Sequence, residues 1–188
     1  MNREVKIKTT MLSLLITLCY GACTHLETDL KDFMTHRIVI PYDSLDYRIC
    51  SLYKNDTVCN YKIKLVSLVE EEGCTACLIK DLSERERTFV GKTDYKDVEF
   101  VYIFRTTKET SKRLYSKLCN YRIEGTVYLD TCNAFLKANP HIPENELFHT
   151  FVINNDGKVL MVGNPFKNKK MEALLDKVIS KEKKTFKK

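Results

Sequence analysis

The sequence predicts one α/β domain built on a mixed β-sheet with helices on its faces. The 188 residues are 44% hydrophobic and the apolar residues are spread along the chain, which is enough for one core. From residue 63 onward, short β-rich apolar runs alternate with segments of helix length. The turn residues at 154–157, Asn-Asn-Asp-Gly, separate the last two apolar runs, which favours an antiparallel hairpin there.

Composition excludes several other classes of protein. The chain has only six glycines and four prolines, which argues against collagen-like and disordered chains. Its 31 basic and 25 acidic residues are mixed along the sequence, so a net charge of +6 gives no strong indication of a nucleic-acid partner. Eight cysteines are many for a reducing compartment, and we therefore expect a chain that is exported.

The first residues have the layout of an export signal. Three basic residues precede an apolar stretch over 11–18, and small residues then lead directly into Cys23. The stretch is far shorter than the roughly 20 residues that a spanning helix needs. We predict a lipoprotein signal peptide over 1–22 and lipid on Cys23, which would anchor the chain to a membrane of the cell envelope, facing the periplasm or the exterior. The alternative is an ordinary secretory signal cut near Ala22.

Two segments precede the main domain in this interpretation. Residues 23–36 are polar and acidic with little periodicity, and we expect a tether. Residues 37–62 are predicted to form a small N-terminal β extension, with strands over 37–41, 47–52 and 57–61. Cys50 and Cys59 lie in the last two strands, where one hairpin register would bring them face to face and a shift of one residue would separate them. The sequence leaves open whether they form a structural disulfide.

The main domain is predicted over 63–181 and a solvated basic tail over 182–188. The expected strands cover 63–69, 98–104, 126–129, 147–153 and 158–163. One expected helix begins at Cys74, and three others cover 108–118, 131–138 and 168–181. This order, β-α-β-α-β-α-β-β-α, is typical of a mixed sheet flanked by helices.

The Cys-x-x-Cys sequence at 74–77 carries the chemistry. A cysteine at the mouth of a helix lies near unsatisfied N–H groups and the positive end of the helix dipole, which favours its thiolate. Cys77 follows about one helical turn later, close enough to form a disulfide with Cys74 and to open it again. We therefore predict that Cys74 is the nucleophile and Cys77 the resolving thiol.

Other interpretations of the cysteines remain. A four-cysteine zinc site would need a second Cys-x-x-Cys, which the chain lacks, and no two histidines have ligand spacing, so we expect neither a metal nor a cofactor. Cys74 and Cys77 could instead form a purely structural bridge. Cys119 and Cys132 could bridge one helix end to the next helix, form a second redox pair, or be buried as small apolar side chains.

Several motifs together resemble one family. They lie at residues 37–41, 73–77, 150–159 and 163–165. Over roughly residues 37–181 the chain resembles thioredoxin-fold envelope lipoproteins, related to the membrane-tethered TlpA/ResA type of thiol-disulfide oxidoreductase. The resemblance implies a thioredoxin-like mixed sheet, in which the hairpin at 150–159 closes the sheet and Cys74 faces the loop before Thr150.

The resemblance also implies a substrate-binding segment at Phe148, His149 and Thr150. Related proteins have a cis-proline where this chain has Phe148, and a non-proline cis bond costs about 2.5 to 4 kcal/mol, so we expect a trans bond here. His149 could supply a proton or stabilise the thiolate, or simply face solvent. Three glutamates directly before Cys74, at 70–72, would raise the pKa of its thiol against the effect of the helix dipole.

Two functions are therefore expected as alternatives. The first is a membrane-tethered thiol-disulfide oxidoreductase that acts on thiols or disulfides of exported proteins and is recharged by an envelope redox partner. The second is a thioredoxin-fold lipoprotein without catalysis, a binding or scaffold module in which Cys74 and Cys77 form a structural disulfide.

Overall fold

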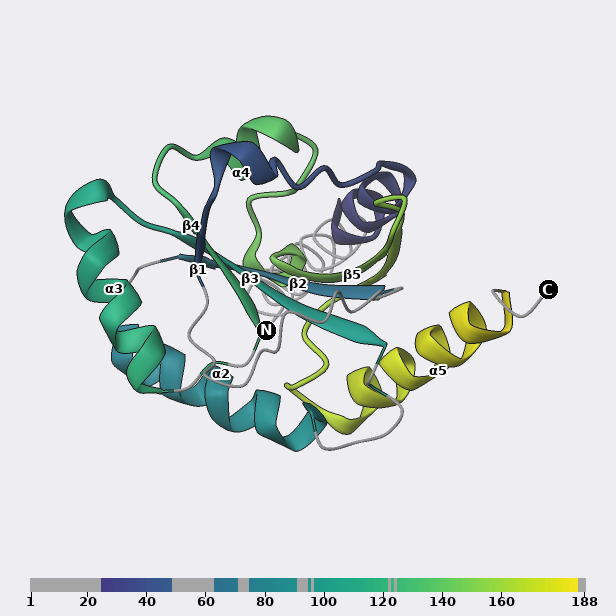
Figure 1. Ribbon diagram of the computed structural model, residues 1–188. Helices are drawn as coiled ribbons and strands as arrows, with labels where there is room; N and C mark the ends of the chain where they lie inside the picture. The colour runs from purple at the N-terminus through teal and green to yellow at the C-terminus, as the bar shows by residue number, and fades with distance from the viewer. Residues whose placement is uncertain are drawn as a thin grey trace, which may run out of the picture.

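The computed structural model describes residues 25–48, 63–70, 75–90, 95, 97–121, 123 and 125–185. Its centre is a six-stranded sheet in the order β1-β4-β3-β2-β5-β6 (Figure 1). The strands are β1 (Asp46–Arg48), β2 (Ile63–Glu70), β3 (Val98–Arg105), β4 (Thr126–Asp130), β5 (Thr150–Asn154) and β6 (Val159–Val162). Strands β2, β3 and β4 are parallel, whereas β5 is antiparallel to β2, β6 to β5 and β1 to β4.

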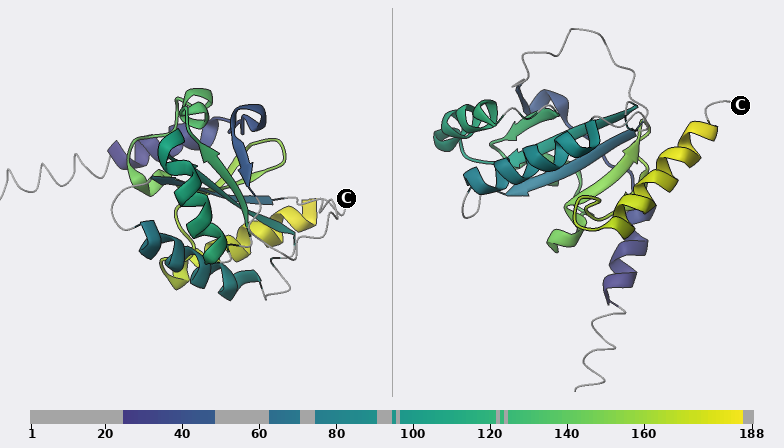
Figure 2. Two further views of the ribbon diagram at one scale, coloured as in Figure 1. Left: turned by 60° about the vertical axis from the view of Figure 1, so that its left-hand side comes forward. Right: turned by 90° about the horizontal axis from the view of Figure 1, so that it is seen from below.

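Helices cover both faces of this sheet, as the views in Figures 1 and 2 show. The helices are α2 (Thr75–Val90), α3 (Lys108–Asn120), α4 (Ala134–Ala138) and α5 (Lys169–Thr185), with short 3₁₀ turns η1 (Tyr42–Ser44) and η3 (Glu146–Phe148). Residues 25–35 are also helical. Helices α2, α3 and α5 contribute to the core on one face, and α4 with the helix at 25–35 to the core on the other.

Strand β2 is buried on both faces because it lies inside the sheet. Ile63 and Leu65 belong to the core under α2 and α5, while Val66 and Leu68 belong to the opposite core. A nearly continuous apolar run is what such an internal parallel strand requires. The predicted α/β class, with a mixed thioredoxin-like sheet flanked by helices and closed by an antiparallel hairpin, is confirmed by this topology.

Two predicted elements begin three residues later than expected, each for a local reason. The strand expected over 147–153 begins only at Thr150, because 146–148 form the 3₁₀ turn η3, capped by the Asn145 side chain, which accepts a hydrogen bond from the backbone N–H of Leu147. The helix expected over 131–138 begins only at Ala134. The buried Asp130 carboxylate ends β4 and accepts hydrogen bonds from the backbone of Ala134 and Phe135, which are donors of the first helical turn.

The segment before the main domain is more ordered than expected. The structure shows a helix at 25–35 where an irregular tether was predicted, because the fully buried Phe33 anchors this segment in the core. The strand expected over 37–41 is only an isolated bridge between Arg37 and Lys158. Strand β1, which lies within the predicted N-terminal β extension, pairs with β4 and so forms an edge of the main sheet.

Several sequence predictions lie outside the described residues. They are the signal peptide at 1–22, the lipidated Cys23, the strand at 57–61, and Cys50 with Cys59. At the other end, α5 continues to Thr185, beyond the predicted start of the basic tail, and Lys183 Nζ lies 3.4 Å from Asp97 Oδ2. No helix in the described part of the chain is both long enough and apolar enough to cross a membrane.

Candidate functional site

The Cys-x-x-Cys sequence belongs to the junction between the central strand and the first long helix after it. Strand β2 ends at Glu70, and α2 begins at Thr75, directly after Cys74. Cys74 lies outside the described residues, and Cys77 is described only as part of the α2 backbone. In open α/β sheets, ligands bind outside the carboxyl ends of the parallel strands. The predicted redox pair therefore follows the carboxyl end of a parallel strand, which is where such sites occur.

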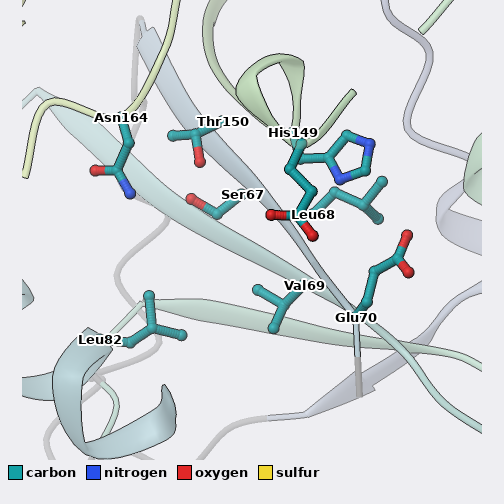
Figure 3. Close-up of a pocket in the computed structure, with 9 residues that line it drawn as sticks. Ser67, Leu68, Val69, Glu70, Leu82, His149, Thr150 and Asn164 are labelled. Atoms are coloured by element: carbon teal, nitrogen blue, oxygen red, sulfur yellow. The ribbon is translucent and has the colours of Figure 1, made fainter. Parts of the chain in front are cut away.

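A pocket of about 280 Å³ lies along the carboxyl half of β2 (Figure 3). Its lining comes from β2, from α2, from the η3 segment with the start of β5, and from the loop after β6. The lining residues are Ser67, Leu68, Val69, Glu70, Leu82, Glu146, His149, Thr150 and Asn164. The end of the strand that leads into the cysteines is thus one wall of an open, mixed polar and apolar site.

Pairing between β2 and β5 brings His149 and Thr150 to this pocket. Thr150 is the register partner of Ser67, and the backbone N–H of Leu68 donates to the carbonyl of His149 at 2.8 Å. His149 is only 8% exposed, and its imidazole forms no hydrogen bond or ion pair within the described residues. Figure 3 shows it among the pocket residues, so the expectation of a solvent-facing histidine is wrong.

Phe148 has a different place from its two neighbours. Its side chain is 2% exposed and packs in the opposite core, where the Phe33 ring meets it edge-on. The peptide bonds of the described residues, including the one before Phe148, are trans, as expected for a residue that is not proline. The structure thus brings His149 and Thr150 to the pocket, whereas Phe148 packs in the core and does not line the pocket.

An ion pair at the end of β2 changes the expected electrostatics. Glu70 is the register partner of Arg105 on β3, and the Arg105 guanidinium donates to the Glu70 carboxylate. Both side chains are about one third exposed, at 34% and 35%. The carboxylate nearest the strand end is therefore compensated, which weakens the argument that the glutamates before Cys74 raise the pKa of its thiol. The other two, Glu71 and Glu72, lie outside the described residues.

The remaining polar residues of the pocket were not predicted to be site residues, although Asn164 belongs to the motif at 163–165. Glu146 lies in η3 and is exposed, and nothing in its sequence context marked it. Asn164 follows the hairpin, and its side-chain oxygen accepts a hydrogen bond from the backbone N–H of Phe166 at 2.8 Å. Ser67 was hidden inside the apolar run of β2. These residues meet only because β2, β5 and the loop after β6 are neighbours in the sheet.

The structure also describes two of the other cysteines. Cys119 and Cys132 form no disulfide with each other; Cys119 is partly buried and Cys132 is exposed. The bridge that the sequence allowed between them is therefore not formed, and Cys132 is not a buried apolar side chain. The described residues contain no group of three His, Cys, Asp or Glu side chains that could hold a metal ion.

Comparison with known proteins gives distant structural likeness alone. No protein-family model matches the chain, and no match was found among curated proteins. An uncharacterized thioredoxin-like protein from Porphyromonas gingivalis is 15% identical, with a TM-score of 0.47 over 72% of this chain and 86% of that one. A proposed thiol-disulfide oxidoreductase from Bacteroides vulgatus is 16% identical, with a TM-score of 0.47 over 65% of this chain and 76% of that one. The chain's own strand order carries the fold assignment.

Proposed function

We propose that the protein is a thiol-disulfide oxidoreductase that works by dithiol-disulfide exchange at Cys74 and Cys77. The observation that carries the proposal is the place of this pair in the chain, with Cys74 directly before α2 and Cys77 in its first turn, after the internal strand β2, whose carboxyl half lines an open pocket. The first turn of α2 contains no acidic residue, so the positive end of its helix dipole is not opposed from within the helix. This favours a thiolate at Cys74.

The reaction then follows from thiol chemistry. In the reducing direction the Cys74 thiolate attacks one sulfur of a substrate disulfide, the substrate S–S bond breaks, and the other sulfur leaves as a thiolate that takes up a proton. Cys77, after losing its proton, attacks Cys74 and releases the second substrate thiol. Two electrons pass from the protein dithiol to the substrate. The opposite direction runs through the same mixed disulfide, and a second dithiol or disulfide protein restores the starting state.

Trapping the mixed disulfide tests this assignment. The Cys77→Ser variant should accumulate a covalent complex with a disulfide-containing peptide, because the resolving thiol is missing, whereas Cys74→Ser should form none. Cys132→Ser is the matched control, since Cys132 is an exposed thiol outside the motif, and it should turn over like the unaltered protein. Complexes that form equally well without Cys74 would refute the assignment.

We also propose that lipid on Cys23 holds the protein at an envelope membrane, where exported proteins would be its substrates. The support is the export-signal pattern before Cys23 in the sequence. Mass spectrometry of the N-terminal peptide from the native host tests it. The mass should show acyl chains on Cys23, and the Cys23→Ser variant should leave the membrane fraction. An unmodified N-terminal peptide beginning at Cys23 would contradict lipidation without affecting the exchange chemistry.

One observation favours the second candidate, a binding module with a structural Cys74–Cys77 bridge. The Phe148 side chain is withdrawn into the core, so the predicted substrate-binding segment offers only His149 and Thr150 to the pocket. In that case the Cys77→Ser variant would trap nothing, and the Cys74–Cys77 disulfide would resist reduction.

A further inference from the structure

The pocket along the carboxyl half of β2 has two chemically different parts. Leu68 supplies apolar surface on the same face of β2 as Glu70 (Figure 3), and Glu146 and His149 supply further polar groups. A lysine or arginine side chain has the same division, with an apolar stem and a cationic head. The lining thus matches one class of amino-acid side chain in both parts.

The charges of the lining favour a cation. None of the described residues that line the pocket is a lysine or arginine, although Arg105 reaches the Glu70 carboxylate from β3. The carboxylate of Glu146 takes part in no ion pair or hydrogen bond within the described residues. Glu146 is therefore a negative charge at the pocket that no described lining residue compensates.

His149 is a second, independent feature of the pocket. Its side chain is more than nine-tenths buried, lines the pocket, and has no hydrogen-bond partner in the described part of the chain. Its ring nitrogens are not among the side-chain atoms that are fully buried without a partner, so they stay accessible to a ligand that donates a hydrogen bond. A neutral imidazole has one nitrogen that accepts, and an ammonium or guanidinium group only donates.

We propose that this pocket binds the side chain of a lysine or arginine that lies close to the reacting cysteine of a substrate protein. The stem packs on Leu68, and the cationic head donates to Glu146 and His149. The inference rests on the proposed exchange reaction at Cys74, because the motif directly follows the strand that forms one wall of the pocket. It adds to that reaction a preference for cationic substrates.

Three disulfide peptides that differ in one residue next to cysteine, Lys, Gln or Glu, test the preference. The reduced full-length protein should reduce the Lys peptide at least several-fold faster than the Glu peptide, with the Gln peptide between them. Glu146→Gln should remove most of this difference, and Glu146→Lys should reverse its direction. Glu144→Gln is the matched control, because Glu144 is an exposed carboxylate two residues away that does not line the pocket.

The outcomes separate the inference from the function on which it rests. Equal rates for all three peptides, or a preference that survives Glu146→Gln, would overturn the cation site and leave the exchange reaction standing. If no peptide is reduced, the exchange reaction fails. The same peptides with serine in place of cysteine then test the pocket alone by NMR titration. Shifts of the His149 ring signals with the Lys peptide and not with the Glu peptide would support the site, and shifts with neither would overturn it.

Discussion

The ring of Phe33 lies edge-on against the ring of Phe148, with centroids 5.9 Å apart and planes at 80°. Phe33 belongs to the helix at 25–35, and Phe148 closes the η3 turn directly before the pocket residue His149. A second edge-on contact joins Phe33 to Phe151 on β5, at 5.4 Å. The N-terminal helix is therefore packed against the segment that positions the candidate site.

Replacing Phe33 with alanine should destabilise the protein strongly. The substitution removes a fully buried ring and both aromatic contacts, and such changes cost about 3 to 5 kcal/mol. Met34→Ala, on the exposed side of the same helix, should change stability by about 0.5 kcal/mol or less. Denaturant unfolding measures both. Equal stability of the two variants would show that the helix at 25–35 is not docked as described.

The Glu70–Arg105 ion pair should affect the pKa of the Cys74 thiol. Arg105→Gln leaves the Glu70 carboxylate uncompensated near the motif and should raise the pKa of the Cys74 thiol, whereas Glu70→Gln should lower it. The double variant should return close to the unaltered protein. Because the pair is partly exposed, shifts of only about 0.3 to 1 pH unit are expected. The pH dependence of Cys74 alkylation measures them, and identical profiles in all four proteins would exclude this role.

The unfolding free energy should fall on acidification because of a histidine pair at the same N-terminal contact. The rings of His36 and His141 are stacked, with centroids 4.4 Å apart, and Asp32 Oδ2 lies 3.6 Å from His36 Nε2. Burial, and next the neighbouring His36, lower the pKa of His141, while Asp32 opposes this shift. The folded protein therefore binds fewer protons at His141 than the unfolded chain does. This contribution to stability is present above the ordinary histidine pKa of about 6.5 and is lost as the pH falls toward the lowered value.

Substitution of that histidine checks the assignment. Between about pH 7.5 and 5.5, above the range where carboxylates titrate, the His141→Gln variant should lose less stability than the unaltered protein. His25→Gln is the control, because His25 is an exposed histidine at the far end of the helix. Parallel pH profiles of the His141 variant and the unaltered protein, followed by urea unfolding, would contradict the lowered pKa.

Gly157 in the hairpin turn should not tolerate a side chain. Its φ is +77°, and an added Cβ would collide with the carbonyl oxygen of Ile38, whose own N–H donates to the Gly157 carbonyl. Gly157→Ala should therefore cost more than about 1 kcal/mol of stability. Asn155→Ala, in the same turn but exposed and at negative φ, is the comparison. A neutral Gly157→Ala, measured by thermal unfolding, would mean that this turn is not as described.

The main sheet was predictable because its signals are local. The β-rich run at 63–69 and the turn at 154–157 each specify their own structure, and they predicted β2 and the β5–β6 hairpin. The helix at 25–35 was missed because one buried side chain, Phe33, decides it, and its partners Phe148 and Phe151 are more than a hundred residues away. No local pattern records such a contact.

The candidate site was predictable in part for the same reason. A redox motif is a local signal, so Cys74 and Cys77 could be placed after β2. The burial of His149 depends on the pairing of β2 with β5. The compensation of the Glu70 charge depends on the register that places Glu70 opposite Arg105 on β3. The pairing of strands and their register are contacts between distant segments, and the sequence alone does not specify them.

The most direct test of the central claim is the redox potential of the Cys74–Cys77 pair. The purified protein would be equilibrated with glutathione mixtures, and alkylation with mass mapping would follow the two cysteines. A working oxidoreductase predicts a reversible couple between about −120 and −270 mV that disappears in Cys74→Ser. A bridge with a potential below about −300 mV, or two thiols that never pair, would contradict the exchange reaction and support a binding module.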